Sequence, residues 1–212
     1  MGDVSSDTGR VETFADGVMA IAITLLVLDL KVPSIGHDTN LRRVLAMEWP
    51  SYVGFLVSFL TIGIMWVNHH HMFKLIERTT HAFLMLNVLF LLPISFLPFP
   101  TSLVAASIRY GNPRRTAAVV YGLTMVAVAI MFNVVWRYAA RGHRLLVDGV
   151  DDEALAKMNR SYASGPVTYA FFTLVAFVSP DASLAGYAAL AAYWLLPGSG
   201  VRATAALRQP EP

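Results

Sequence analysis

The stretch Arg10–Leu30 reads RVETFADGVMAIAITLLVLDL, a polar opening followed by a run without charge from Val18 to Leu28. A helix turns by about 100° per residue, so each position can be assigned to a face of the predicted helix. One stripe holds Phe14, Gly17, Ile21, Thr24, Leu25 and Leu28. Asp16 and Ile23 fall on the opposite side. The sequence therefore predicts a helix with two different faces, in which the acid points away from the stripe.

The whole chain is too apolar for a domain surrounded by water. Of its 212 residues, 56% are hydrophobic and only 14% are charged, whereas soluble domains carry about 25% charged residues. A chain of this length must leave much of its surface exposed, so one large core does not explain the excess. The composition predicts a multi-pass membrane protein in contact with lipid.

The composition also excludes several kinds of site. There is no cysteine, which rules out disulfides, thiolate catalysis and metal held by cysteine. The net charge is +2, and the arginines lie between apolar blocks rather than in one basic patch. A nucleic-acid partner is therefore not expected.

Six apolar blocks can be cut from the chain, at about residues 14–30, 50–68, 82–104, 116–136, 162–178 and 184–200. Most are near the roughly 20 residues that cross a bilayer as a helix. If the N-terminus is inside, the cytoplasmic segments hold more Lys and Arg than the outer ones, which favours both termini in the cytoplasm. We therefore expect an all-α protein, a single six-helix transmembrane domain over residues 1–212.

Three finer features of the chain follow from local sequence. Residues 41–45 are expected to form a short interfacial helix, and residues 153–159 a short surface helix. Pro93, Pro98 and Pro100 lie in the third block. That helix should kink or break, with a neighbouring helix satisfying the freed carbonyl groups.

Asp16 is the most costly residue to place in an apolar span. An acid there faces protein or water and finds a partner, which makes it a functional candidate. Alternatively, it lies in the first turn of the helix, where the positive end of the macrodipole favours an anion. Gly17 beside it is typical of close helix approach in membranes.

Three consecutive histidines, His69, His70 and His71, end the second block. They point in three directions on a helix and lack the i, i+4 spacing of a zinc site, which argues against bound metal or haem. By the predicted topology they lie level with Arg10 and Asp16. We expect an Arg–Asp–His cluster between the first two helices, because these groups are costly alone in lipid.

The stripe of the first helix has a simpler interpretation, since apolar residues at helical spacing usually face a core. The sequence contains no Thr-Val-Gly-Tyr-Gly potassium filter, no Walker loop, no dinucleotide fingerprint and no nucleophile elbow. Neither an enzyme nor a cofactor is therefore indicated.

A family resemblance begins at the opening motif, Arg10-x-x-x-Phe14-Ala15-Asp16-Gly17, with Ile21 to Asp29 after it. Further segments are Trp66-x-x-His69-His70-x-x-Phe73 and Leu92-Pro93 through Leu97-Pro98-Phe99. Together they resemble the bacterial and archaeal relatives of the endosomal/lysosomal potassium channel. The chain departs from that family at Ala15, where a serine is usual.

The resemblance implies a potassium-selective channel in a prokaryotic cell membrane, a homotetramer whose pore is lined by the first helix of each subunit. Ile21 would form the narrowest ring, Thr24 the ring that contributes to ion selectivity, and Leu25 and Leu28 further apolar rings. K⁺ would be the permeant ion, with no bound metal or cofactor. The motif and cluster residues Arg10, Phe14, Asp16, Gly17, Trp66, His69 and His70 would hold the first helix without touching the ion.

Two other classes stay open at this point. A secondary transporter or proton-coupled carrier would use Asp16 and a helix-2 histidine; inverted repeats would favour it, and none is visible. A membrane-bound haem or metal enzyme would need ligands that face one another, and the histidine spacing argues against that.

Overall fold

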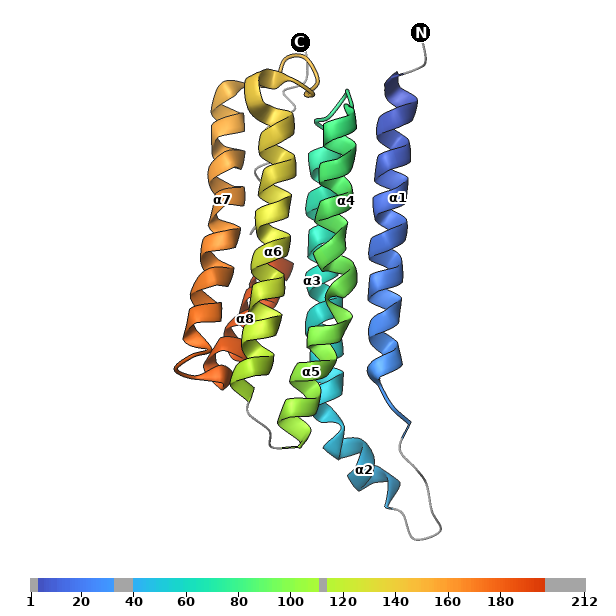
Figure 1. Cartoon of the computed structure of the whole chain (residues 1–212), viewed down its shortest axis with the longest axis vertical. Coiled ribbons are helices and arrows are strands. Elements are labelled where there is room, and N and C mark those ends of the chain that lie inside the picture. Colours follow the sequence, from blue (N-terminus) through green and yellow to red (C-terminus); the bar gives the residue numbers. More distant parts are fainter. Residues whose placement is uncertain (1–3, 33–39, 111–113, 197–212) are drawn as a thin grey trace.

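The computed structural model describes residues 4–32, 40–110 and 114–196, and these residues fold into helices. The elements are α1 (Val4–Leu25), η1 (Leu26–Asp29), α2 (Leu41–Met47), α3 (Trp49–Phe73), α4 (His81–Phe96), α5 (Pro98–Arg109), α6 (Arg114–Ala140), η2 (Arg141–His143), α7 (Asp152–Val175) and α8 (Pro180–Leu195). Figure 1 shows a long upright bundle with α1 at one side and α6 to α8 at the other. The predicted all-helical fold is confirmed for this part of the chain.

Four segments are long and apolar enough to cross a membrane: residues 8–29, 49–73, 81–109 and 114–143. The other two predicted spans are less clear. The first three turns of α7 are rich in charged residues, and α8 has only 16 residues, about 24 Å against the ~30 Å of a hydrocarbon core. Of the six predicted spans, four are therefore clear in the described residues. Residues 197–200 of the sixth block lie outside the described residues.

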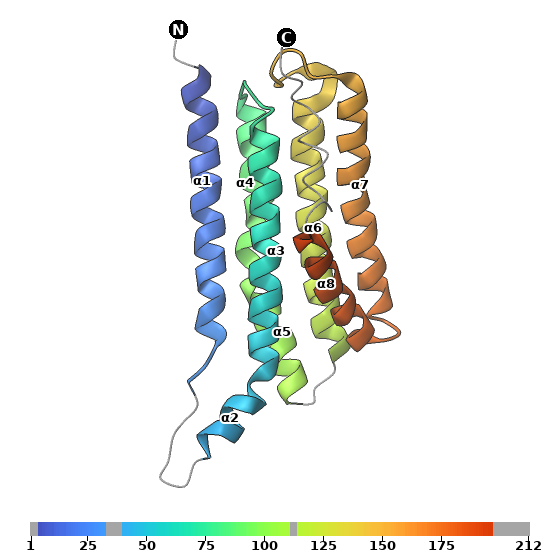
Figure 2. The same ribbon diagram turned by 180° about the vertical axis from the view of Figure 1, so that it is seen from behind.

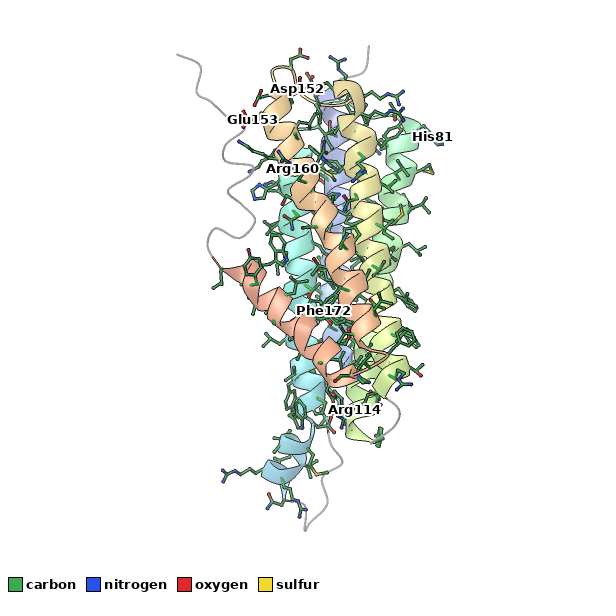
Figure 3. All side chains as sticks on the ribbon, turned by 90° about the vertical axis from the view of Figure 1, so that its left-hand side faces the viewer. His81, Arg114, Asp152, Glu153, Arg160 and Phe172 are labelled. Carbon is green, nitrogen blue, oxygen red and sulfur yellow. The ribbon has the colours of Figure 1, made fainter. Side chains whose placement is uncertain are left out.

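The predicted separation of a surface helix from the fifth block is wrong. One helix, α7, runs from Asp152 to Val175. Its first turns contain charged residues, but Leu155 and Met158 in these turns are buried in the core, so the buried face of the helix begins there. Figure 3 shows Glu153 and Arg160 at one end of α7, and Phe172 further along it, where α8 lies.

The proline-rich block breaks as predicted, between α4 and α5. The break lies at Leu97, directly before Pro98, while Pro93 stays inside α4. Pro98 has no N–H to offer to the carbonyl group of Ile94. That oxygen accepts instead from the backbone N–H of Leu97, at 3.1 Å. The freed carbonyl is therefore satisfied by its own chain, not by a neighbouring helix.

The expected interfacial helix is present as α2. Its first turn is capped by Asn40, whose side-chain oxygen accepts from the backbone N–H of Arg43 at 3.2 Å. Such a cap satisfies one of the donors that a helix leaves free at its start. The helix extends two residues further than predicted, to Met47.

Helices α6, α7 and α8 are tied together by buried polar contacts. The indole N–H of Trp136 on α6 donates to Asn159 on α7 at 2.7 Å. The hydroxyl groups of Thr173 and Tyr187 join α7 to α8 at 2.9 Å. Both approach Gly122 of α6 so closely that a Cβ there would lie 2.5 Å from either oxygen. The absence of a side chain at Gly122 is therefore what allows the three helices to meet.

Two loops meet at the end of the bundle where α1 begins. The backbone N–H of Glu77 donates to Leu145 at 2.8 Å, and that of Val147 donates to Leu75 at 3.0 Å. These bonds connect the α3–α4 turn with the segment between η2 and α7, around an isolated antiparallel bridge from Ile76 to Leu146. The two halves of the bundle are thus joined by backbone contacts at this end.

Candidate functional site

Helix α1 lies at the edge of the bundle and packs against α3 and α4; Figure 2 shows it from the opposite side. One face is buried there, formed by Ala15, Met19 and Ala22 and continued by Leu26 of η1. On a helix these four positions fall within about 60° of one another, between about 100° and 160° from Ile21. We call this set the bound face. The bound face packs α1 against α3 and α4, and the other side of the helix stays uncovered.

The stripe predicted from helical angles lies on the uncovered side of α1. The side chain of Ile21 is 61% exposed and that of Leu28 is 72% exposed. The remaining stripe residues, Phe14, Gly17, Thr24 and Leu25, are exposed as well. Leu28 belongs to η1, whose tighter turn differs from an α-helix, yet it stays on the uncovered side. In the single subunit the stripe therefore contacts no core.

Thr24 places a hydroxyl group in the middle of this apolar stripe. Its Oγ1 donates to the backbone oxygen of Ile21, at 2.9 Å. The hydroxyl proton is thereby used within the helix, so the lone pairs of Oγ1 remain available as acceptors. A cation is the kind of partner that such an oxygen can bind.

Two polar pairs fasten α1 to α3. The indole N–H of Trp66 donates to Asp16 at 2.8 Å, and His70 Nδ1 lies 2.7 Å from a carboxylate oxygen of Glu12. The two acids are four residues apart on α1, and Trp66 and His70 are four residues apart on α3. The earlier acid meets the later aromatic residue, as expected for antiparallel helices. The rings of Trp66 and His70 are stacked, with centroids 6.1 Å apart. The acids and the aromatic groups thus form a two-step ladder.

His69 is turned away from this ladder and is fully buried between α3 and α4. Its Nε2 lies 3.3 Å from Oδ1 of Asn87. The amide nitrogen of Asn87 donates to the backbone oxygen of Phe83, so Oδ1 is the acceptor and Nε2 carries the proton. The His69 ring also stacks on Phe90. This histidine therefore fixes α3 to α4.

The expected Arg–Asp–His cluster takes a different form. Asp16 is bound to Trp66, not to a histidine, and the acid that meets His70 is Glu12. Arg10 is exposed and has no ion-pair partner among the described residues. It lines a groove between α1 and α4 together with Phe14. Gly17 has no atom within 4 Å of where a Cβ would lie, so no close helix approach requires it within one subunit.

Sequence reasoning missed Glu12 and Asn87. A signal for Glu12 was available, because Glu12 and Asp16 are four residues apart, as are Trp66 and His70. Side chains at that spacing share one face of a helix, so the two pairs match across antiparallel helices. For Asn87 no comparable pattern exists in the sequence.

The third histidine, His71, points elsewhere and lines a cavity between α3, α6, α7 and α8. No group of three or more His, Asp or Glu side chains that could hold a metal ion occurs in the described parts of the chain. The three consecutive histidines thus lie in three environments: His69 between α3 and α4, His70 against α1, and His71 at the cavity.

The sequence and the fold can now be compared with known proteins. The family described as endosomal/lysosomal potassium channel TMEM175 matches residues 10–98. A potassium channel of Streptomyces collinus is 42% identical over 189 residues, which cover 89% of this chain and 92% of that protein. One of Chamaesiphon minutus is 44% identical over 193 residues, covering 90% of this chain and 95% of the relative.

The fold agrees with these relatives. The crystal structure of a lysosomal potassium-selective channel TMEM175 homologue from Chamaesiphon minutus superposes with a TM-score of 0.80 at 40% identity. The match covers 93% of this chain and 98% of that chain. The family resemblance of the opening motif is therefore confirmed, and the chain belongs to the TMEM175 family.

Proposed function

We propose that the protein is a potassium-selective channel in which several copies surround one pore and the stripe of α1 faces the pore axis. The observation that carries this proposal is the contrast between the two faces of α1. Met19 on the bound face is 1% exposed, whereas Ile21 is 61% exposed. The relatives from Streptomyces collinus and Chamaesiphon minutus are potassium channels, which supports K⁺ as the permeant ion.

The narrowest point of the pore is a ring of Ile21 side chains. This residue is large, apolar and mostly exposed in the single subunit, and a ring of such side chains gates a pore by excluding water. Leu25 and Leu28 form further apolar rings towards the end of the helix. Because the sequence contains no Thr-Val-Gly-Tyr-Gly segment, selectivity must come from other groups.

Thr24 is the selectivity residue in this proposal. It lies one turn from Ile21, and its hydroxyl oxygen retains free lone pairs after donating to the Ile21 carbonyl group. A ring of such oxygens replaces part of the water shell of an ion that has left bulk solvent at the apolar constriction. No charged side chain lies on the stripe, so the ring discriminates among cations through oxygen dipoles alone.

The Trp66–Asp16 and His70–Glu12 pairs hold the pore helix in place. They lie on α3 and on the side of α1 that faces away from the stripe, so they support the helix without reaching the permeating ion. Asp16 accepts a hydrogen bond from the indole N–H of Trp66, a group that donates but does not ionise at neutral pH. Asp16 thus meets no histidine, which argues against the rival carrier that would use Asp16 and a helix-2 histidine.

The assembly is proposed to be a homotetramer in the cell membrane, with six helices per subunit crossing the bilayer and both termini in the cytoplasm. The four clear spans and the distribution of Lys and Arg support this arrangement. Four copies of α1 then enclose an axis that a single subunit cannot form. The mass of the purified assembly, measured by light scattering with detergent subtracted, tests the number of copies.

The reversal potential of the purified protein in liposomes tests the function. Opposed gradients of K⁺ and Na⁺ are imposed, and a potential close to the K⁺ equilibrium value is expected. An ohmic current that does not saturate at low ion concentration distinguishes a pore from a carrier. Slow, saturating uptake without channel currents would contradict the proposal and favour the carrier.

A further inference from the structure

A cavity separate from α1 lies between α3, α6, α7 and α8. Figure 2 shows α8 crossing obliquely in front of α6 and ending near the middle of the bundle, between α3 and α7. Helix α8 has 16 residues and ends at Leu195. The cavity lies beside its last turns, where Leu190 and Trp194 form one wall.

The chemistry of the lining favours a neutral and largely apolar ligand. The walls include aromatic and aliphatic side chains such as Phe132, Met158 and Tyr162. Among the described residues that line the cavity, none is Asp, Glu, Lys or Arg. A phosphate or carboxylate headgroup would find no opposite permanent charge here, and burying it unpaired would be unfavourable.

One buried polar atom in this lining lacks a partner. Asn133 of α6 is 8% exposed, and its amide nitrogen donates to the backbone oxygens of Ala129 and Tyr162, at 2.9 and 2.8 Å. Both amide hydrogens are therefore used and the orientation of the side chain is fixed. Oδ1 is buried and accepts no hydrogen bond from the described residues. Because buried polar atoms are normally paired, Oδ1 is the acceptor in this lining that is left for a donor group of a ligand.

We propose that this cavity binds a neutral lipid alcohol, a molecule with a hydrocarbon body and a single hydroxyl group. The hydroxyl group donates to Oδ1 of Asn133, and the hydrocarbon lies along the apolar walls towards Trp194. A water molecule would satisfy the acceptor but not fill the apolar walls. No described residue of α1 lines this cavity.

Photolabelling of the intact purified protein tests the site. The probe is octanol carrying a diazirine, and mass spectrometry of peptides locates the adduct. Adducts are expected on the segments 128–133 and 158–169, and unlabelled octanol should compete with the probe. Octyl methyl ether has a similar hydrocarbon body but no donor, so it should compete about three- to tenfold less well, the range expected for one hydrogen bond of about 0.7–1.4 kcal/mol.

Two variants on α7 make the test independent of Asn133. Ser161→Phe adds a ring from a residue that lines the cavity and should reduce labelling at least about tenfold by filling the space. Val167→Phe, at a position that is 70% exposed and not part of the lining, should leave labelling unchanged. Each variant is compared at equal amounts of folded assembly, as judged by size-exclusion chromatography.

A third variant addresses the acceptor itself. In Asn133→Leu, the preference for octanol over its methyl ether should disappear, because no acceptor is left for the hydroxyl group. If this variant does not fold, the comparison of alcohol and ether in the unaltered protein still decides the point. Equal competition by the two compounds, adducts confined to other helices, or undiminished labelling of Ser161→Phe would each overturn the proposal.

Discussion

Helices α1 and α6 are both apolar enough to cross a membrane, but the fold covers them to different extents. In the most apolar window of α6, 44% of the residues are buried within the subunit, whereas in α1 only 22% are. Helix α6 packs against α4, α5, α7 and α8, while α1 lies at the edge against α3 and α4. Two helices of similar hydropathy therefore lie in different places, α6 at the centre of the subunit and α1 at its edge with one face uncovered.

The difference also separates two kinds of apolar residue. Those on the buried face of α6 meet partners inside the subunit, as the close fit around Gly122 illustrates. Those on the stripe of α1 are exposed in the single subunit. Five substitutions test this contrast, beginning with the largest expected effect.

Met19→Ala should destabilise the subunit most. Met19 is buried on the bound face of α1, and removing a buried side chain of this size costs about 2–5 kcal/mol of unfolding free energy. Denaturant titration of the protein in detergent micelles measures the loss. Ile21→Ala is the matched control on the opposite face and should cost less than half as much. Equal losses would mean that the two faces do not differ.

Trp66→Phe should weaken the attachment of α1 to α3. The substitution keeps an aromatic ring but removes the N–H that donates to Asp16 at 2.8 Å, and a hydrogen bond to a charged group contributes about 1.5–3 kcal/mol. Thermal unfolding measures the change. In an Asp16→Ala background the same substitution should have little further effect. Trp49→Phe, at an exposed position, serves as the control; additivity of Trp66→Phe and Asp16→Ala would contradict the contact.

Gly122→Ala should disturb the packed half of the bundle. The added methyl group would lie 2.5 Å from the hydroxyl oxygens of Thr173 and Tyr187, and overpacking of this kind costs about 1–3 kcal/mol. Gly63→Ala on α3 is the control, since nothing lies within 4 Å of its Cβ position. The midpoint of thermal unfolding should fall for Gly122→Ala and should not fall for Gly63→Ala. A common shift would show that α6 is packed less closely than its contacts indicate.

Ile21→Asn should increase the current through the assembled channel. A ring of amide groups hydrates the constriction, and lowering the barrier by about 1.4 kcal/mol raises conductance roughly tenfold. Currents from equal amounts of protein in planar bilayers measure the effect. Val27→Asn, at an exposed position of η1 that is not part of the stripe, should leave the current nearly unchanged. An unaltered current in Ile21→Asn would exclude Ile21 as the constriction.

Thr24→Ala should have the smallest effect and alter selectivity rather than stability. Loss of the hydroxyl oxygen is expected to lower the permeability of K⁺ relative to Na⁺ about threefold, equivalent to roughly 0.6 kcal/mol. The reversal potential under opposed gradients measures the shift. Thr24→Ser retains the oxygen and should keep the selectivity of the unaltered protein. Identical potentials for the alanine and serine variants would exclude Thr24 from ion recognition.

Local sequence was sufficient where a feature depends on one helix. The angle between the stripe and Asp16 follows from helical geometry alone, and the structure places the stripe on the uncovered side. The break before Pro98 follows from a missing donor. The family resemblance of the Arg10–Gly17 motif also needed only adjacent residues, and it is confirmed by relatives that extend along most of the chain.

Features that depend on contacts between helices could not be predicted in the same way. The continuity of α7 rests on Leu155 and Met158 finding a core beneath charged turns, which the local charge pattern conceals. The partner of His69 is Asn87, a neutral residue without any motif. The predicted cluster left open which histidine meets Asp16, and the acid that meets His70 is Glu12, one turn earlier. The register of α1 against α3 is set by packing, which local sequence does not show.

The ladder of Glu12, Asp16, Trp66 and His70 limits how α1 can move along α3. If α1 slid by one turn along α3, about 5.4 Å, Glu12 would come level with Trp66 and still find a donor. Asp16 would then lie level with Ile62, a buried residue with no polar side chain. An acid left without a partner in an apolar setting is costly, so a stroke of α1 in this direction is opposed. A stroke in the opposite direction brings Asp16 level with His70 and Glu12 level with Lys74, so both acids meet a polar side chain. The ladder therefore resists translation of α1 in one direction only.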